Sequence, residues 1–234
     1  MGKNIVLFCF SALLLAVFTT SSCKPEDTIP PLITLNGNNP DTILLPAIAG
    51  TAVFTDPGFV AQDNKDGNVT NQVKVFGTVN PNLKGQYTLT YSVKDAAGNV
   101  ATANRIVQVI NQAQPLAGTY GTVLDSIIGQ NLTVFYVQTI NTDNYVNNLI
   151  HFNKFCNIWA DSTVYAVASG PNDMILTVPS QTVTRIGTHY NETHTFSGSG
   201  TDSTGLLTPP SIYLLYTHKD TAGVVTNHYT VWKQ

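Results

Sequence analysis

The chain has 234 residues, enough for two small domains or one large one after an N-terminal segment is set aside. Charged residues make up 11% of the chain and the formal net charge is −3, so a basic surface that binds nucleic acid is not expected. The three cysteines also argue against a disulfide framework or a cysteine-based metal cluster, because two of them lie at the N-terminal end.

Residues 1–22 have the pattern of a signal peptide. Lys3 is followed by an uncharged apolar run over residues 5–18, which is shorter than the roughly 20 residues that a membrane-spanning helix needs. Small residues then lead to Cys23. This arrangement resembles a bacterial lipoprotein signal, and the resemblance implies cleavage before Cys23 and acylation of its thiol. The alternative is an ordinary secretory signal with an incidental cysteine.

Residues 23–29, "CKPEDTI", form a charged tether after the cysteine. The stretch resembles the surface-export signal of Bacteroidota lipoproteins, which implies a protein anchored by lipid in the cell outer membrane and facing outside. Two or three acyl chains would hold it there, because each buried CH₂ contributes about 0.8 kcal/mol. The alternative is a solvated tether that faces the periplasm.

Residues 30–110 are predicted to form the first β-domain. In "GQYTLTYSVK", Tyr87, Leu89, Tyr91 and Val93 alternate with polar residues, so they share one face of a strand. Turn residues separate this run from similar short runs on either side. Period-two alternation with frequent turns predicts a β-sandwich.

The motifs of this domain resemble the bacterial immunoglobulin-like (Ig-like) repeat of surface lipoproteins and pesticidal crystal proteins. The residues that carry the resemblance are Asp56-Pro57-Gly58, Asp63, Asp66-Gly67, Gly85-x-Tyr87, Tyr91, Asp95, Gly98-Asn99 and Arg105. It implies a seven-stranded Ig-like sandwich that acts as a spacer or adhesive module and has no catalytic activity.

Possible calcium ligands in this domain are Asp56, Asp63, Asp66 and Asn68. Their spacing departs from that of an EF-hand loop, so they are predicted to stabilise turns.

Residues 111–115 are predicted as a linker, and residues 116–234 as a second antiparallel β-domain. Eight β-type runs joined mostly by short turns favour an up-and-down, eight-stranded barrel over a sandwich, which makes the whole chain all-β. The stretch "LAGTY" resembles the opening of lipocalin-like barrels, with Tyr120 at the usual tryptophan position. The interior of such a barrel is either filled by side chains or holds one small ligand.

No catalytic or metal-binding constellation is predicted. The five histidines all lie in the second domain. His189 and His194 are five positions apart and would face opposite sides of an extended strand, and His151, His218 and His228 lie on other runs, so they are not expected to converge, the alternative being a chance cluster across strands. Cys156 is expected to be a buried small hydrophobe. Paired glutamates for glycoside hydrolysis and a G-x-S-x-G nucleophile elbow are missing from the sequence, so we expect neither enzyme activity nor a cofactor.

Three aromatic residues of the second domain are candidate ligand contacts: Trp159, Trp232 and Tyr229. Their rings offer stacking faces for sugars, although packing is the alternative role for each. Tyr229 and Trp232 are an odd number of positions apart on one run, so they are predicted to point to opposite faces of the strand, with one of them in the core.

Six short triplets consist of an aspartate, a hydroxyl residue and a small or aliphatic residue. They resemble the O-glycosylation acceptor of Bacteroidota, and the implied sites are Thr28, Thr42, Ser126, Ser162, Ser203 and Thr221. Aspartate followed by serine or threonine is also common in ordinary turns.

These patterns together predict a lipid-anchored surface binding protein. An Ig-like spacer would present a second β-domain to a glycan or to another component of a nutrient-uptake complex. The alternatives are a lipocalin-like carrier of a small amphipathic ligand and a structural or adhesion lipoprotein of the envelope. An open apolar cavity in the second domain would favour the carrier, and a filled core with exposed aromatics would favour glycan binding.

Overall fold

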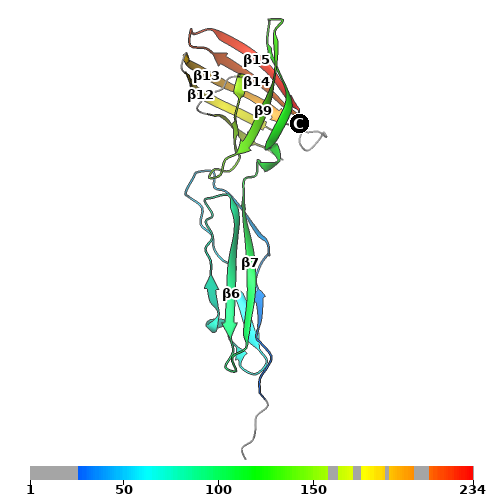
Figure 1. Ribbon diagram of the computed structural model, residues 1–234, viewed down its shortest axis with the longest axis vertical. Helices are drawn as coiled ribbons and strands as arrows, with labels where there is room; N and C mark the ends of the chain where they lie inside the picture. Colours follow the sequence, from blue (N-terminus) through cyan, green and yellow to red (C-terminus); the bar gives the residue numbers. More distant parts are fainter. Residues whose placement is uncertain (1–25, 158–162, 171–174, 188–189, 203–210, 234) are drawn as a thin grey trace, which may run out of the picture. The chain divides into compact units, whose positions relative to one another are not determined.

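The computed structural model describes residues 26–157, 163–170, 175–187, 190–202 and 211–233 (Figure 1). Cys23, Trp159, Ser162, His189 and Ser203 lie outside these residues, so the predictions made for them stay predictions. The described elements are β-strands and single-turn 3₁₀ helices. Within the described chain, no helix has the length and apolar character that crossing a membrane requires.

The described residues group into two compact units. The smaller unit comprises the chain up to Thr34, Phe59–Lys74 and Ser92–Thr102, and the larger unit comprises the remaining residues. The eight barrel strands described below all belong to the larger unit.

In the described residues before the barrel there are seven strands, as predicted for an Ig-like sandwich. They are β1 (Leu32–Leu35), β2 (Asp41–Leu44), β3 (Phe59–Asp63), β4 (Gly67–Asn68), β5 (Lys74–Phe76), β6 (Gly85–Lys94) and β7 (Val100–Ile110), with the 3₁₀ helix η2 (Thr70–Gln72). They form a three-stranded sheet in the order β1-β3-β4 and a four-stranded sheet in the order β2-β7-β6-β5. β2 pairs with β7 in parallel, with Asp41 opposite Val107.

The predicted alternation on β6 is confirmed: Leu89, Tyr91 and Val93 are buried, whereas the residues between them are more exposed. The smaller unit contains a compact apolar cluster built from both sheets. Its members are Ala61, Val69 and Val93, packed against Ile33, Val73 and Ala101. A core of such small side chains buries little apolar surface, so hydrogen-bonded polar groups have a large share in holding this region together.

Arg105 on β7 belongs to the larger unit, and its side chain is fully buried. Its guanidinium donates to the backbone carbonyls of Asn36, Asn38 and Gly58 at 2.7–2.9 Å. Its Nε donates to the Tyr91 hydroxyl at 3.1 Å and lies 3.3 Å from the Asp56 carboxylate. The Tyr91 hydroxyl in turn donates to Asp56 at 2.8 Å. Several motif residues of the Ig-like resemblance thus form one network around a buried cation, here called the Arg105 network.

The second β-domain is a closed eight-stranded barrel, which confirms the preferred prediction. Its strands are β8 (Gly118–Ile127), β9 (Thr133–Thr142), β10 (Leu149–Phe152), β11 (Val164–Ser169), β12 (Ile175–Gly187), β13 (Tyr190–Asp202), β14 (Ser211–Lys219) and β15 (Val225–Lys233). Each strand pairs antiparallel with its neighbour in sequence, and β15 closes the barrel on β8, with Trp232 opposite Val123. The 3₁₀ helix η3 (Gln114–Leu116) precedes the barrel, and η4 (Phe155–Asn157) follows β10.

Aromatic side chains fill much of the barrel interior. Trp232 is fully buried and its ring centroid lies 4.8 Å from that of Phe152 and 6.3 Å from that of Tyr120. Phe155 of η4 enters the same cluster, 5.1 Å from Phe196. Rings in these tilted and edge-to-face arrangements stabilise a core beyond their area burial.

Two glycines allow β13 to approach β14 closely. Gly198 lies opposite Tyr216 and Gly200 lies opposite Leu214, on the inward face of the barrel. A Cβ atom at Gly200 would overlap the backbone carbonyl oxygen of Tyr213. Glycine therefore permits a local strand geometry that any larger residue would disturb.

Candidate functional site

A cavity of about 260 Å³ opens into the barrel interior beside the β8–β9 and β14–β15 hairpins. Its lining combines aliphatic side chains with acidic, histidine, hydroxyl and thiol side chains. The lining residues are Asp125, Ile127, Val134, Cys156, His218, Asp220, Val224, Thr226 and His228. The inner wall of the barrel thus changes from aromatic to polar at this end. We call this end the polar mouth.

Asp125 of β8 is the buried acid of the polar mouth, with 4% of its surface exposed. Its carboxylate accepts hydrogen bonds from the Tyr216 hydroxyl at 2.6 Å, from the Thr230 hydroxyl at 2.8 Å and from Nδ1 of His228 at 3.1 Å. Burial acts to raise the pKa of Asp125, but the hydrogen bonds from His228, Tyr216 and Thr230 outweigh it and hold the pKa below its usual value. Asp125 is therefore an anion at neutral pH.

His218 and His194 form a second pair in the polar mouth. Nδ1 of His194 lies 2.9 Å from Nε2 of His218, and the rings are 5.1 Å apart. Burial, with the neighbouring His194 and His228, lowers the pKa of His218 to about 4. The His218 ring is consequently neutral at pH 7 and keeps one nitrogen lone pair.

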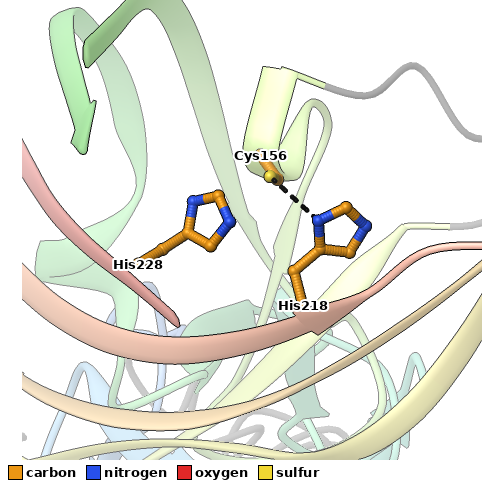
Figure 2. Close-up of side chains that lie close together, drawn as sticks. All are labelled: Cys156, His218 and His228. Carbon is orange, nitrogen blue, oxygen red and sulfur yellow. Dashed lines mark hydrogen bonds between the residues drawn. The ribbon is translucent and has the colours of Figure 1, made fainter. Parts of the chain in front are cut away.

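Cys156 reaches the polar mouth from η4. Its backbone is left-handed (φ 53°), as is that of Asn157 (φ 55°), a conformation uncommon for residues other than glycine. Its Sγ lies 3.9 Å from Nδ1 of His218 (Figure 2). Burial and the negative charge of Asp125 raise the pKa of the Cys156 thiol to about 12, so it is protonated at neutral pH. Cys156 packs against the aromatic core, in line with its predicted role, but it also faces a histidine.

The prediction that the histidines do not converge is wrong for three of them. One ligand atom each of Cys156, His218 and His228 lies within 4.8 Å of the other two. His194 joins through its contact with His218, whereas His151 is bound elsewhere, to Asp143 at 2.8 Å.

A sequence signal for this convergence exists. In "SIYLLYTHKD" and "HYTVWKQ", the alternation that places Tyr216 and Trp232 inside also places His218 and His228 inside. Because one hairpin joins the two runs, inward residues near it are neighbours. The position of Cys156 depends on the irregular η4 turn, and no periodicity predicts it.

The outer face of the barrel carries a shallow groove of about 450 Å³ across β12–β15. Leu215 and Tyr229 are 54% and 41% exposed, and Ile175 is 47% exposed. Tyr213 also lines the groove, with the hydroxyl residues Ser199 and Thr201 on β13. We call this surface the outer groove.

The two described aromatic residues that were predicted to contact a ligand differ in their exposure to solvent. Trp232 is a core residue and offers no face to a ligand outside the barrel, so the structure corrects its assignment as a ligand contact. Tyr229 lies on the opposite face of the same strand, in the outer groove. The prediction that the two residues point to opposite faces is confirmed. Tyr213 was missed, although its alternation with the buried Leu214 points it outward.

Four of the predicted O-glycosylation residues are described. Thr28 and Thr42 are exposed. Ser126 is half-buried and its hydroxyl lies 3.0 Å from that of Thr133. The exposed Thr221 hydroxyl accepts a hydrogen bond from the backbone N–H of Thr193 at 2.7 Å. The same hydroxyl donates to the backbone carbonyl of Thr193 at 3.2 Å, and O-glycosylation of Thr221 would remove this donated bond. Modification of Thr28 or Thr42 would not disturb a buried group.

The acids of the Ig-like motifs make turn contacts, as predicted. Asp56 Oδ1 accepts from the N–H of Gly58, Asn68 Oδ1 from that of Thr70, and Asp63 Oδ1 from those of Lys65 and Asp66. Asp95 accepts from the backbone and side chain of Asn99. Carboxylate oxygens of Asp27, Asp63 and Asp95 lie within 4.8 Å of one another.

Comparisons with known proteins agree with the fold of the N-terminal region. Residues 33–109 match the family model of the bacterial surface protein Ig-like domain. This part of the chain is therefore a bacterial surface Ig-like domain. A comparison with curated proteins finds no significant match.

Three solved structures are similar over most of the chain. A lipoprotein of Bacteroides thetaiotaomicron is 22% identical, with 87% of this chain and 100% of that chain covered and a TM-score of 0.32. A candidate outer membrane protein of Bacteroides fragilis is 12% identical. The match covers 80% of this chain and 94% of that chain, with a TM-score of 0.35. A structure from Clostridium perfringens ZmpB, which contains CBM51-2 in complex with GlcNAc and INT domains, is 15% identical. The match covers 87% of this chain and 44% of that chain, with a TM-score of 0.26.

Proposed function

We propose that this protein is a lipid-anchored, non-catalytic glycan-binding protein of the bacterial cell surface. In this role, Cys23 carries the anchor, the Ig-like domain is the spacer, and the barrel contacts the glycan through the outer groove. The match of residues 33–109 to a bacterial surface domain supports the location. The signal-peptide pattern before Cys23 supports the anchor.

The observation that carries the choice of ligand is the filled barrel interior. Trp232, Phe152, Phe155 and Phe196 occupy the space that a lipocalin-like carrier would use for its ligand. The remaining cavity of about 260 Å³ falls below the roughly 300–1,000 Å³ typical of small-molecule sites. A filled core disfavours the carrier and leaves the outer surface as the place for recognition.

The outer groove has the chemistry that a sugar needs. The apolar C–H face of a pyranose ring packs on aromatic and aliphatic side chains, here Tyr213, Tyr229 and Leu215. Its hydroxyl groups require hydrogen-bonding partners, for which the exposed hydroxyl groups of Ser199 and Thr201 in the groove are available. Shallow surfaces of this kind accept one part of a long chain, which suits a polysaccharide better than a small metabolite.

A glycan array followed by calorimetry with the strongest hit tests the proposal. We expect Tyr229→Ala to weaken binding by at least tenfold, because it removes one wall of the groove. The matched control is Phe135→Ala, which removes a 67% exposed aromatic residue of β9 that does not line the groove. Equal loss in both variants would contradict binding at the outer groove. Binding of a lipid or hydrophobic dye in place of glycans would favour the amphipathic carrier.

The anchor is tested separately. Mass spectrometry of the protein from its natural membrane should show acyl chains on Cys23, and Cys23→Ser should release the protein from the membrane fraction. Proteolysis of intact cells distinguishes an outward-facing protein, which is digested, from a periplasmic one. Deletion of the barrel without loss of contact with surface partners would favour the structural or adhesion role.

A further inference from the structure

We propose that the polar mouth of the barrel binds one Zn²⁺ ion through Cys156, His218 and His228. Cysteine sulfur and histidine nitrogen are the ligands that zinc prefers, and three protein ligands with one open position form a known type of zinc site. The proposed site is independent of the outer groove, because it shares no residue with that surface.

The spacing of the three ligand atoms supports a mononuclear site. All three lie within 4.8 Å of one another, and the Cys156 Sγ to His218 Nδ1 distance is 3.9 Å. In a tetrahedral zinc site the corresponding separations are about 3.3–3.6 Å, as follows from bond lengths of 2.0–2.3 Å. A shift of about 1 Å or less in each side chain therefore completes the geometry. Figure 2 shows the three side chains converging from two neighbouring strands and the η4 turn.

Outer hydrogen bonds orient both histidines for a metal. Nδ1 of His228 donates to the buried Asp125 carboxylate, which places the lone pair on Nε2. Without a metal this lone pair accepts a hydrogen bond from the Thr226 hydroxyl at 2.8 Å, so a bound ion would take the place of that hydroxyl. This is the carboxylate–histidine–metal arrangement that fixes the ring and raises its basicity. For His218, Nε2 faces Nδ1 of His194, and Nε2 of His194 lies 3.4 Å from Glu192. This chain of contacts leaves Nδ1 of His218 directed at Cys156.

The backbone of η4 supplies the third ligand in an unusual conformation. Cys156 and Asn157 are consecutive non-glycine residues with positive φ. Such geometry is sparsely populated and persists where the surroundings enforce it, often at functional sites. Here it aims the thiol at His218. A bound ion would fasten the η4 turn to β14 and β15 and so brace one end of the barrel.

Cys156, His218 and His228 all line the cavity, which leaves space beside them for a fourth ligand. Asp125 already accepts three hydrogen bonds, so it acts as an orienting group and a water molecule takes the open position. Binding replaces the S–H bond of Cys156 with an S–Zn bond and releases one proton to solvent. Ca²⁺ and Mg²⁺ are disfavoured because they prefer oxygen ligands.

The test uses the full chain after treatment with a chelator. Titration with Zn²⁺ should show one tight site per chain and a rise in Tm. Titration with Co²⁺ should show tetrahedral d–d bands and a thiolate-to-metal charge-transfer band, which reports the sulfur ligand directly. Cys156→Ser should abolish the charge-transfer band and weaken Zn²⁺ binding at least tenfold. His218→Gln should weaken it by a similar factor.

The control is His151→Gln, since His151 is a barrel histidine that contacts Asp143 outside the polar mouth. It should leave the stoichiometry, the affinity and the cobalt spectrum unchanged. Circular dichroism of each metal-free variant verifies folding. If Cys156→Ser does not fold, the loss of Zn²⁺ affinity in His218→Gln tests the proposal instead. Absence of a one-to-one site would overturn the proposal, and so would a site that is unaffected by Cys156→Ser and His218→Gln.

Discussion

The N-terminal region and the barrel each bury a charged side chain, but they satisfy its charge in different ways. Arg105 is a permanent cation whose guanidinium is held chiefly by backbone carbonyls, with Tyr91 and Asp56 as side-chain partners. Asp125 is an anion held by three side chains, those of Tyr216, Thr230 and His228.

The difference separates a structural centre from one that can support chemistry. Arginine does not lose its proton in proteins, and the backbone fixes the carbonyl groups that accept from it. The Arg105 guanidinium therefore has a single protonation state and a single set of backbone partners. The partners of Asp125 border a cavity and include a histidine beside a thiol. Such groups exchange protons or take up a metal, which a guanidinium enclosed by carbonyls does not do.

The largest expected effect comes from breaking the Arg105 network. Arg105→Ala should lower the free energy of unfolding by about 3–5 kcal/mol, because it leaves buried carbonyls and the Asp56 charge without their partner. Chemical denaturation measures the change. Lys74→Ala removes an exposed cation of β5 and should cost less than about 0.5 kcal/mol. Similar losses in both variants would contradict a special role for Arg105.

In the barrel, the strongest backbone effect is expected at Gly200. Gly200→Ala should destabilise the protein by about 2–3 kcal/mol, because the new Cβ would overlap the backbone of β14. Gly121→Ala on β8 is the matched control, since its Cβ would enter open space and should be tolerated. Thermal unfolding distinguishes the two. If Gly200→Ala does not lower the stability, β13 must lie farther from β14 than the structure shows.

A smaller effect is expected from removing one donor to Asp125. Tyr216→Phe should cost about 1–2 kcal/mol, because it deletes a 2.6 Å hydrogen bond to a buried carboxylate but leaves those from Thr230 and His228. Tyr213→Phe removes a hydroxyl on the outer face of the same strand and should be nearly neutral. Equal stabilities of the two variants in urea would show that the Asp125 contacts add little.

The smallest predicted effect depends on pH. Burial acts to raise the pKa of Asp143, but hydrogen bonds from His151 and from the backbone N–H groups of Tyr145 and Val146 lower it below 3.8. The carboxylate thus stabilises the fold above its unfolded pKa, and this stability is lost as pH falls through the lower folded pKa.

Asp143→Asn should accordingly cost about 0.5–1 kcal/mol at pH 7. The difference from the natural protein should shrink as the pH falls below 3.8 and disappear once the pH has passed the lowered pKa of the folded state. Denaturation curves at several pH values measure it. A difference that is constant down to pH 2 would assign the effect to packing.

Much of the fold is predictable because alternation and turns act locally. The period-two pattern of "GQYTLTYSVK" predicts the buried face of β6, and the eight runs after residue 115 predict the barrel strands. The motif residues Asp56, Tyr91 and Arg105 indicate the Ig-like class, although the sequence does not show that they meet in one network.

The candidate sites were harder to predict, since they depend on which strands become neighbours. The spacing of Tyr229 and Trp232 predicts that they face opposite sides of the strand, and the structure shows that Tyr229 is the outward one. The groove itself forms because β13 places small residues beside Tyr213 and Leu215. His218 and His228 meet through the pairing of β14 with β15, and Cys156 joins through a left-handed turn. Such turns depend on tertiary context, which a linear pattern does not encode.

The closure of β15 onto β8 has a consequence for partner proteins. In the described chain every barrel strand has a neighbour on both sides, whereas the N-terminal sheets end in β1 and β4, and in β2 and β5. A partner that contributes a strand of its own by main-chain pairing therefore finds an open edge among the N-terminal strands and none in the barrel. New protein contacts on the barrel therefore depend on its side chains and loops, since main-chain pairing with its strands is already complete.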